Sequence, residues 1–308
     1  MQAVAGPSYL LVTPVYEEAE LLDELVTSVR SQELRPHAWV IVDDGSADGT
    51  AATLARAARR DPWIHVVALP RLERRPPPAL RYAEVLGIGF RAAAEIAEAD
   101  GIDHAYVANL DADIRCPPGL MADLVARAEG DRMLGIVSAA LVEVREDGEI
   151  VPQLGLPCGS PHGGLRLWRR ECLEEIAFYP SPQWASVTGV RARNRGWKTM
   201  IDAELSAEVV RADATRDGWW AGYRRMGQAE WHVGMHPIVV AAQAVTASAR
   251  ERDLRGLALV AGYVESALRR QRRSHDPEVL DYFGDDLPRE RFGDWIDRLP
   301  RFGRPRRR

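Results

Sequence analysis

Three acidic motifs, each placed shortly after an apolar run, constrain this chain more than any other sequence feature. The runs and their motifs are 9–13 with Glu17-Glu18, 38–42 with Asp43-Asp44, and 105–110 with Asp111-Ala112-Asp113. Segments with helical spacing of apolar residues separate the runs. Strands that alternate with helices pair in parallel, so their carboxyl ends meet at one edge, where such sheets bind ligands. The pattern predicts an α/β fold with an acidic ligand site at that edge.

The segments that follow extend this fold and then change character. Residues 64–69 and 134–142 are further strand candidates, which predicts a mostly parallel sheet flanked by helices. Beyond residue 150, helical patterns dominate, at 186–195, 217–232, 236–250 and 254–272. The segments that begin at His236 and Leu257 are strongly apolar. They either pack on each other or lie at a membrane interface.

The cationic residues are almost all arginine, which excludes two kinds of chemistry. Of the 40 Lys+Arg residues only Lys198 is a lysine, and it lies where a helix end runs into a strand. A Walker-type P-loop and a Schiff-base enzyme both need a positioned lysine.

The three cysteines (Cys116, Cys158 and Cys172) form no CxxC motif, and no HExxH zinc motif occurs. A lysine-based phosphate site and these metal or redox motifs are therefore excluded.

Charge and hydropathy indicate the cellular location of the protein. The net charge is −5, although six arginines and no acids lie between Arg298 and Arg308. An acidic body argues against general nucleic-acid binding, and the basic tail is either a disordered solvated segment or a contact for anionic lipid or RNA. The N-terminus does not resemble a signal peptide, and no apolar run reaches about 18 residues. We expect a cytoplasmic protein, with peripheral contact at the inner face of the membrane as the alternative.

The acidic motifs carry a family resemblance when they are taken in order. They read Thr13-Pro14-Val15-Tyr16-Glu17-Glu18, Val42-Asp43-Asp44-Gly45-Ser46-Ala47-Asp48-Gly49-Thr50 and Asp111-Ala112-Asp113. In this order and spacing the chain resembles the family 2 glycosyltransferases of the GT-A fold, in particular a bacterial and archaeal subgroup, over residues 8–250. The resemblance implies a GT-A domain at 1–215, with a nucleotide-binding half (1–115) and an acceptor half (116–215). A helical extension (216–290) and a basic tail (291–308), expected to be disordered, follow.

The resemblance also implies a substrate and a metal. The donor would be a nucleotide diphosphate sugar, with a UDP-sugar favoured and a hexose or GlcNAc as the transferred group. The acceptor would be a glycan, a lipid-linked molecule or a small molecule. Mg²⁺ or Mn²⁺ would neutralise the diphosphate, since these hard cations prefer carboxylate oxygens.

Individual residues receive roles from the same resemblance. Asp113, with Asp111, would ligate the metal. The implied nucleotide-binding residues are Pro14, Val15, Tyr16, Glu17, Asp43, Asp44, Arg81, Asp111 and Ala112. The alternative for Asp43-Asp44-Gly45-Ser46 is a turn that caps a helix.

The acceptor side resembles the family but departs from it at one position. Gly163-Gly164 precedes a strand and an Arg-Arg-Glu helix start, and the helix that begins near Trp184 matches the one that carries the base in inverting relatives. Where those relatives have a base Asp, this chain has Ala185. A metal-associated histidine is also missing, because Val209 stands in its place. Gly163, Gly164, Trp184 and Ala185 are the predicted acceptor residues.

Four alternative mechanisms or roles follow from the alanine at position 185. Asp202 or Glu171 could serve as the base. The acceptor could already be anionic, like a polyprenyl phosphate, and need no base. The transfer could retain configuration, with a donor phosphate oxygen taking the proton. Finally, the protein could be a catalytically silent binder of nucleotide sugars. General-base catalysis contributes about 10²–10⁴-fold, so its loss slows an inverting enzyme without abolishing donor binding.

Two further segments allow competing interpretations. Gly87-Ile88-Gly89-Phe90-Arg91-Ala92 fits a dinucleotide fingerprint, but that motif must follow a buried strand, and this one lies within a helical pattern, where the glycines would ease packing. Residues 71–78 contain three arginines and three prolines, which predicts a mobile loop able to act as a lid.

Overall fold

The computed structural model describes residues 7–144, 150–152, 161–211 and 218–293. The chain divides into two compact units, Met1–Arg211 and Ala212–Arg308. The first unit ends at Arg211, close to the border predicted at residue 215. The predicted turn at Asp147-Gly148, Cys158 and the tail arginines from Arg298 onward lie outside the described residues.

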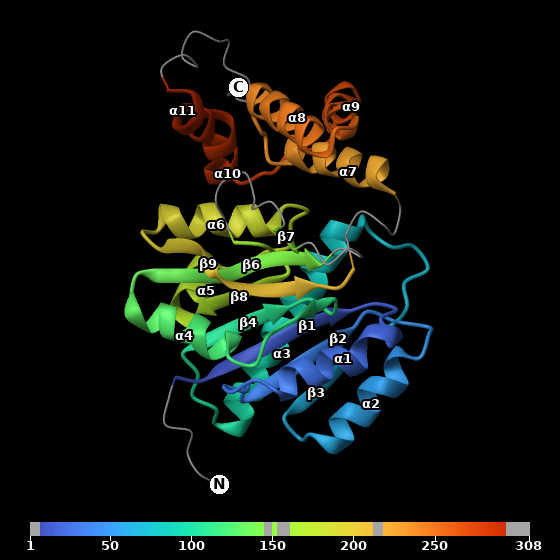
Figure 1. Cartoon of the computed structure of the whole chain (residues 1–308), viewed down its shortest axis with the longest axis vertical. Helices are drawn as coiled ribbons and strands as arrows, with labels where there is room; N and C mark the ends of the chain where they lie inside the picture. The colour runs from blue at the N-terminus through green and yellow to red at the C-terminus, as the bar shows by residue number, and fades with distance from the viewer. Residues whose placement is uncertain (1–6, 145–149, 153–160, 212–217, 294–308) are drawn as a thin grey trace. The chain divides into compact units, whose positions relative to one another are not determined.

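The first unit is built on a nine-stranded mixed sheet (Figure 1). The strands are β1 (Tyr9–Val15), β2 (Ala38–Asp43), β3 (Ile64–Ala68), β4 (Tyr106–Leu110), β5 (Ile114–Arg115), β6 (Leu134–Val144), β7 (Ile150–Pro152), β8 (Leu165–Arg169) and β9 (Lys198–Val209). Their order is β3-β2-β1-β4-β8-β6-β9-β5, with β7 paired to β6 off this path. The first four strands in this order are parallel, as are β6 and β9, whereas β8 runs antiparallel to both of its neighbours.

Helices cover both faces of this sheet. They are α1 (Ala19–Arg30), α2 (Thr50–Arg60), α3 (Pro78–Asp100), α4 (Leu120–Gly130), α5 (Arg170–Ile176) and α6 (Trp184–Asn194). Successive residues of a strand point to opposite faces. Accordingly Tyr9 and Leu11 of β1 join the core under α1, α2 and α4, while Leu10 and Val12 join the core under α3, α5 and α6. The predicted α/β class with a helix-flanked, mostly parallel sheet is confirmed.

Close packing of α3 on the sheet explains the glycines that mimic a dinucleotide motif. Gly87 and Gly89 lie inside the continuous helix α3. A Cβ atom on Gly89 would lie 2.3 Å from a methyl carbon of Val12 in β1, which is closer than any side chain could pack. The interpretation of these glycines as packing residues is therefore confirmed.

The second unit is helical. Its elements are α7 (Trp219–His232), α8 (Pro237–Glu251), α9 (Arg255–Leu268), α10 (Pro277–Asp281), the π-helix η1 (Tyr282–Asp286) and α11 (Leu287–Phe292). A Cβ on Gly262 of α9 would lie 1.9 Å from the Arg224 carbonyl of α7, and one on Gly256 would lie 2.0 Å from the Ala244 carbonyl of α8. The two apolar helices, α8 and α9, thus pack on each other, which is the first of the two alternatives predicted for them. Among the described residues, no helix is long and apolar enough to cross a membrane.

Candidate active site

The carboxyl ends of β1, β2 and β4 bring the three acidic motifs to one edge of the sheet. In the register of β1 and β2, Val15 lies beside Asp43, and the Asp44 amide donates to the Val15 carbonyl over 2.9 Å. On the other side of β1, β4 runs in the same direction and ends at Leu110, directly before Asp111. The predicted convergence is therefore present in the fold.

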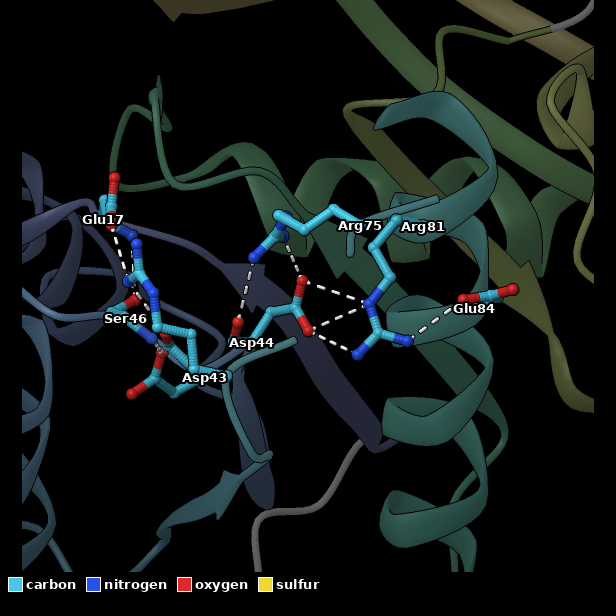
Figure 2. A network of polar contacts seen from close by, with 9 residues as sticks. Glu17, Asp43, Asp44, Ser46, Arg75, Arg81 and Glu84 are labelled. Atoms are coloured by element: carbon cyan, nitrogen blue, oxygen red, sulfur yellow. Dashed lines mark hydrogen bonds and ion pairs between the residues drawn. The ribbon is translucent and has the colours of Figure 1, made fainter. Parts of the chain in front are cut away.

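Asp44 is buried and held by two arginines (Figure 2). Arg81 of α3 donates to its Oδ1 from Nε over 3.0 Å and from Nη2 over 2.5 Å. Arg75 donates to Oδ2 and also to the Asp44 carbonyl, the latter over 3.3 Å. Glu84 accepts from the remaining Nη1 of Arg81 over 3.0 Å. Two guanidinium groups thus offset the buried charge, and both oxygens of the Asp44 carboxylate are occupied.

The arginine-rich segment after β3 lies against the end of β1. The Arg75 guanidinium carbon is 3.5 Å from the centroid of the Tyr16 ring, a cation–π contact. Arg71 donates to the Glu17 carboxylate over 3.0 Å. Gly45 has a φ of 72°, and a Cβ there would lie 2.5 Å from the Arg71 Cα, so the segment can approach only because this residue is glycine. The segment predicted as a lid therefore contacts residues predicted to line the nucleoside site.

Asp43 shapes the turn beneath this segment. Its Oδ1 accepts from the Ser46 amide over 3.0 Å, and the Ser46 hydroxyl oxygen accepts from the Glu17 amide over 2.8 Å. The N-cap of α2 is Gly49, and the Asp48 side chain accepts from the amide of Thr50, the first residue of the helix, over 2.9 Å. For Asp43-Asp44-Gly45-Ser46 the predicted turn is therefore present, while the side-chain cap of α2 comes from Asp48, outside these four residues.

Asp111 is oriented by a tyrosine that the motifs do not contain. The Tyr82 hydroxyl of α3 donates to Oδ1 of Asp111. Burial, together with the charges of Asp111 and Asp113, raises the pKa of Tyr82 well above its usual value, so the hydroxyl remains a donor. Tyr82 therefore fixes the rotamer of the first carboxylate in this motif.

The end of β9 completes the surroundings of the motif. The Val210 amide donates to the Asp113 carbonyl over 2.9 Å. The next residue, Arg211, donates to both Glu18 carboxylate oxygens over 2.7 and 2.6 Å. An ion pair between Glu18, the N-cap of α1, and Arg211, which follows β9, thus lies next to the Asp111–Asp113 turn.

The Gly163-Gly164 pair separates the acidic motif from the start of α6. A Cβ on Gly164 would lie 2.9 Å from Oδ2 of Asp111, and one on Gly163 would lie 3.5 Å from the Cβ of Ala185. The side-chain amide of Asn109 donates to the Gly163 carbonyl over 2.7 Å and holds this backbone in place. The fold thus brings the predicted metal ligand Asp111 and the predicted acceptor residues together.

A buried arginine supports the first turn of α6. Arg166 of β8 is fully buried and donates to the Ala185 carbonyl over 2.8 Å and to the Thr188 hydroxyl over 2.9 Å. The Trp184 ring stacks on Tyr82 with centroids 5.9 Å apart and an interplanar angle of 18°. The position of Ala185 is therefore tied both to β8 and to the tyrosine that orients Asp111.

The two carboxylates predicted as replacement bases lie elsewhere. The antiparallel strand β8 pairs Arg169 with Tyr106, the first residue of β4, so Glu171 lies at the edge opposite the acidic motifs. Asp202 of β9 is buried, with Oδ2 2.7 Å from Nε of Arg127 in α4. Helix α4 covers the face of the sheet opposite to α6. The structure brings neither carboxylate to Ala185.

The residues at the Asp111–Asp113 turn fit a cation that shares its coordination with substrate. Among the described residues, no group of three or more His, Cys, Asp or Glu side chains forms a protein-only metal cage. Mg²⁺ typically takes one or two protein carboxylates and completes its shell with phosphate oxygens and water. Asp111 and Asp113 supply such a pair of hard oxygen donors.

Two site residues escaped prediction because their roles depend on tertiary contacts. Tyr82 and Arg166 occur beside or within the sequence motifs, yet no local pattern gives either of them a role. Arg75 is predicted only as part of a loop able to act as a lid, and its contacts with Asp44 and Tyr16 are set by the tertiary structure. A tyrosine directly after Arg81, and an arginine within the apolar pattern of β8, are the only signals that the sequence offers.

Comparison with known proteins identifies the family. The model of the family described as Glycosyl transferase family 2 matches residues 10–185, which is more than half of the chain. The chain belongs to glycosyl transferase family 2. The match includes all three acidic motifs and ends at Ala185. None of the curated proteins compared with it matches the chain.

Solved structures share the fold of this family 2 member. The mannosyltransferase PcManGT from Pyrobaculum calidifontis, solved with GDP-Man and Mn²⁺, is 20% identical, with a TM-score of 0.56 over 92% of this chain and 81% of that one. S. aureus TarS, solved with UDP-GlcNAc, is 16% identical, with a TM-score of 0.52 over 72% and 65%. At such identities the likeness shows the fold, and the predicted GT-A class is confirmed.

Proposed function

We propose that this chain transfers a hexose or N-acetylhexosamine from a nucleoside diphosphate sugar, with a UDP-sugar favoured, to an acceptor bound beside Ala185. The observation that carries the proposal is the Gly163-Gly164 backbone, which lies between Asp111 and Ala185, so that the proposed donor and acceptor sides would adjoin. Family membership supports it. The nucleotide sugars in the PcManGT and TarS structures support it as well.

The donor would lie along the edge formed by β1, β2 and β4. Asp113 and Asp111 would hold Mg²⁺ or Mn²⁺, which, when bound, supplies positive charge to the leaving diphosphate. Pro14, Val15, Tyr16 and Glu17 would line the nucleoside.

The two neighbouring aspartates would have different tasks. Asp43 uses Oδ1 in the turn, and its Oδ2 would accept from the imide N–H of a uracil-like base. Asp44 would position Arg81 and Arg75 beside the donor, because its own carboxylate is occupied by these two arginines.

The acceptor that fits best carries an oxygen that is already anionic, such as a phosphate. Alanine at 185 cannot take a proton, and Asp202 and Glu171 lie elsewhere. In the reaction, the acceptor oxygen would bond to the anomeric carbon while the bond from that carbon to the diphosphate breaks. The bonding electrons would leave with the nucleoside diphosphate. No proton has to be removed from a phosphate oxyanion, so no base is required.

Isothermal titration with UDP and Mn²⁺ tests the donor site. We expect the wild-type protein to bind UDP only with Mn²⁺ present. In Asp113→Ala, adding Mn²⁺ should no longer produce UDP binding. Asp103→Ala is the matched control, since this exposed aspartate precedes β4 at the opposite edge of the sheet. Absence of UDP binding, or equal binding by Asp113→Ala, would contradict the proposal.

A further inference from the structure

One face of α9 is apolar although it points away from the helical unit. We call Leu254, Leu257, Val260, Ala261, Val264 and Leu268 the α9 stripe. These residues recur at spacings of three and four and so lie on one side of the helix. Leu257 is 55% exposed, Val264 44% and Leu268 80%. A surface helix normally presents polar side chains on its outer face. The exposed face of α9 is apolar instead.

The opposite face of α9 is already committed to packing. Gly256 and Gly262 allow the backbones of α8 and α7 to approach α9 closely. The Tyr263 hydroxyl donates to the Met235 carbonyl over 2.7 Å, and Tyr263 is buried. Rotating the helix to hide the stripe would break these contacts. The stripe is therefore a stable external surface of the second unit.

Positive charge is concentrated at the end of the stripe. Six arginines and only two acids lie between residues 252 and 273, in a chain whose net charge is −5. Both acids are engaged, Asp253 by Arg255 at 2.7 Å, and Glu265 by Arg224 at 2.5 Å and by Arg269 at 2.7 Å. Arg269, Arg270 and Arg272 are exposed directly after Leu268. The surface thus combines an apolar band with a cationic end.

We propose that the α9 stripe docks on the surface of a lipid bilayer that contains anionic headgroups. An apolar helix face inserts at the boundary of the headgroup and acyl regions, and arginines at its end pair with anionic lipid. The helix would lie on the membrane, because no described helix is able to span it. A second copy of the chain would cover the apolar band but would not account for the cluster of arginines beside it. This proposal does not depend on sugar transfer.

Vesicle sedimentation with the full-length protein tests the surface. We compare vesicles of phosphatidylcholine alone with vesicles that also contain phosphatidylglycerol. The wild-type protein should bind the anionic vesicles, and salt should weaken the binding because it screens exposed charges. A triple variant, Leu257→Gln with Val264→Gln and Leu268→Gln, should bind about 100-fold more weakly, since three apolar side chains no longer leave water.

Two further variants separate charge from apolar area. Changing Arg269, Arg270 and Arg272 to Gln should weaken binding to anionic vesicles by about fivefold for each arginine and leave binding to neutral vesicles unchanged. Met133→Gln is the matched control, because Met133 is an exposed apolar residue of the first unit at 47% exposure. Its vesicle binding should equal that of the wild type. Far-UV circular dichroism should show that all variants keep their helices, since every changed side chain is exposed.

Three outcomes would overturn the proposal. One is failure of the wild-type protein to bind anionic vesicles. Another is equal binding by the triple apolar variant. The third is a concentration-dependent dimer, seen by analytical ultracentrifugation, that the triple apolar variant abolishes, because it would assign the stripe to a second copy of the chain.

Discussion

Arg81 and Asp44 form an ion pair in which two guanidinium nitrogens reach one carboxylate oxygen, Nε over 3.0 Å and Nη2 over 2.5 Å. Arg81 comes from α3 and Asp44 follows β2, so the pair ties a helix to the edge of the sheet that carries the acidic motifs. Because the Asp44 side chain is only 4% exposed, its charge depends on the arginines around it.

Removing Arg81 should therefore cost both stability and donor affinity. Arg81→Ala leaves Asp44 with Arg75 alone, and we expect the free energy of unfolding in urea to fall by about 2 kcal/mol. Arg81→Lys should restore only part of this loss, because an ammonium group cannot form the two-pronged contact. Arg59→Ala, at an exposed position of α2, should stay close to wild type. An Arg81→Ala protein as stable as wild type would show that Arg75 alone suffices.

Gly164→Ala should disturb Asp111 without touching the donor directly. The new methyl carbon would lie 2.9 Å from Oδ2 of Asp111 and 2.8 Å from a methyl carbon of Ile114, so the carboxylate has to move. We expect at least about tenfold weaker UDP binding in the presence of Mn²⁺ by calorimetry. Gly130→Ala, where the methyl group meets open space, is the control. Unchanged UDP affinity in Gly164→Ala would mean that Asp111 does not contribute to the donor site.

Tyr82→Phe removes the hydroxyl that orients Asp111 and keeps the ring that stacks on Trp184. Loss of such an orienting partner typically lowers metal affinity by about 10–100-fold, and we expect the Mn²⁺ dependence of UDP binding to shift to that extent. Tyr106→Phe is a matched control, since it removes a similar tyrosine–carboxylate hydrogen bond to Glu129 away from the site. Equal Mn²⁺ dependence in both variants would contradict the orienting role.

Ala185→Asp distinguishes the acceptor classes. If the acceptor oxygen is anionic, a new carboxylate beside it should repel the substrate, and we expect transfer to fall by about tenfold, with Ala185→Asn as the uncharged control. If the acceptor is a neutral hydroxyl, the same aspartate could serve as a base and raise the rate by up to about 10²–10⁴-fold. Transfer assays over a panel of phosphate and hydroxyl acceptors would decide, and a rate increase would contradict the anionic acceptor proposed above.

The second unit should lose stability as the pH rises, because of Glu230. This glutamate of α7 is 1% exposed, and burial raises its pKa from 4.5 to about 8. Gln243 of α8 and the charge of Arg291 oppose that rise only in part. Between pH 4.5 and about 8 the folded state therefore keeps a proton that the unfolded chain has released. The contribution of Glu230 to the free energy of unfolding is greatest at the low end of this pH range and falls until the pH passes about 8.

Urea denaturation between pH 5 and 8 would measure this slope, which one such group limits to about 1.4 kcal/mol for each pH unit. Glu230→Gln should remove the fall that this group causes, because the amide does not ionise. The contribution of His232 and His236 should remain, and it has the opposite sign, because burial lowers the pKa of both histidines. Glu98→Gln, at an exposed position of α3, should leave it unchanged. A wild-type slope that persists in Glu230→Gln would assign the pH dependence to other groups.

Much of the proposed donor side could be predicted from local patterns. The apolar runs, the helical spacing between them and the acids at their ends determine a parallel sheet with carboxylates at one edge, since parallel strands all end on the same side. The sequence alone therefore suffices to place Asp43, Asp44 and Asp111 together. The packing role of the α3 glycines is likewise predictable, because a helical pattern on both sides of Gly87 excludes a strand-to-helix turn.

The partners of these residues were decided by tertiary structure. Asp44 is paired with Arg75 and Arg81, which lie 31 and 37 positions away along the chain, and no local spacing specifies such a contact. The direction of β8 could not be read from its composition, because an apolar strand is equally compatible with parallel or antiparallel pairing once both of its faces are buried. Antiparallel pairing carries Glu171 to the far edge and brings Gly163-Gly164 against Asp111. The sequence by itself determined which residues gather at the ends of the strands, and the tertiary structure decided which of them face one another.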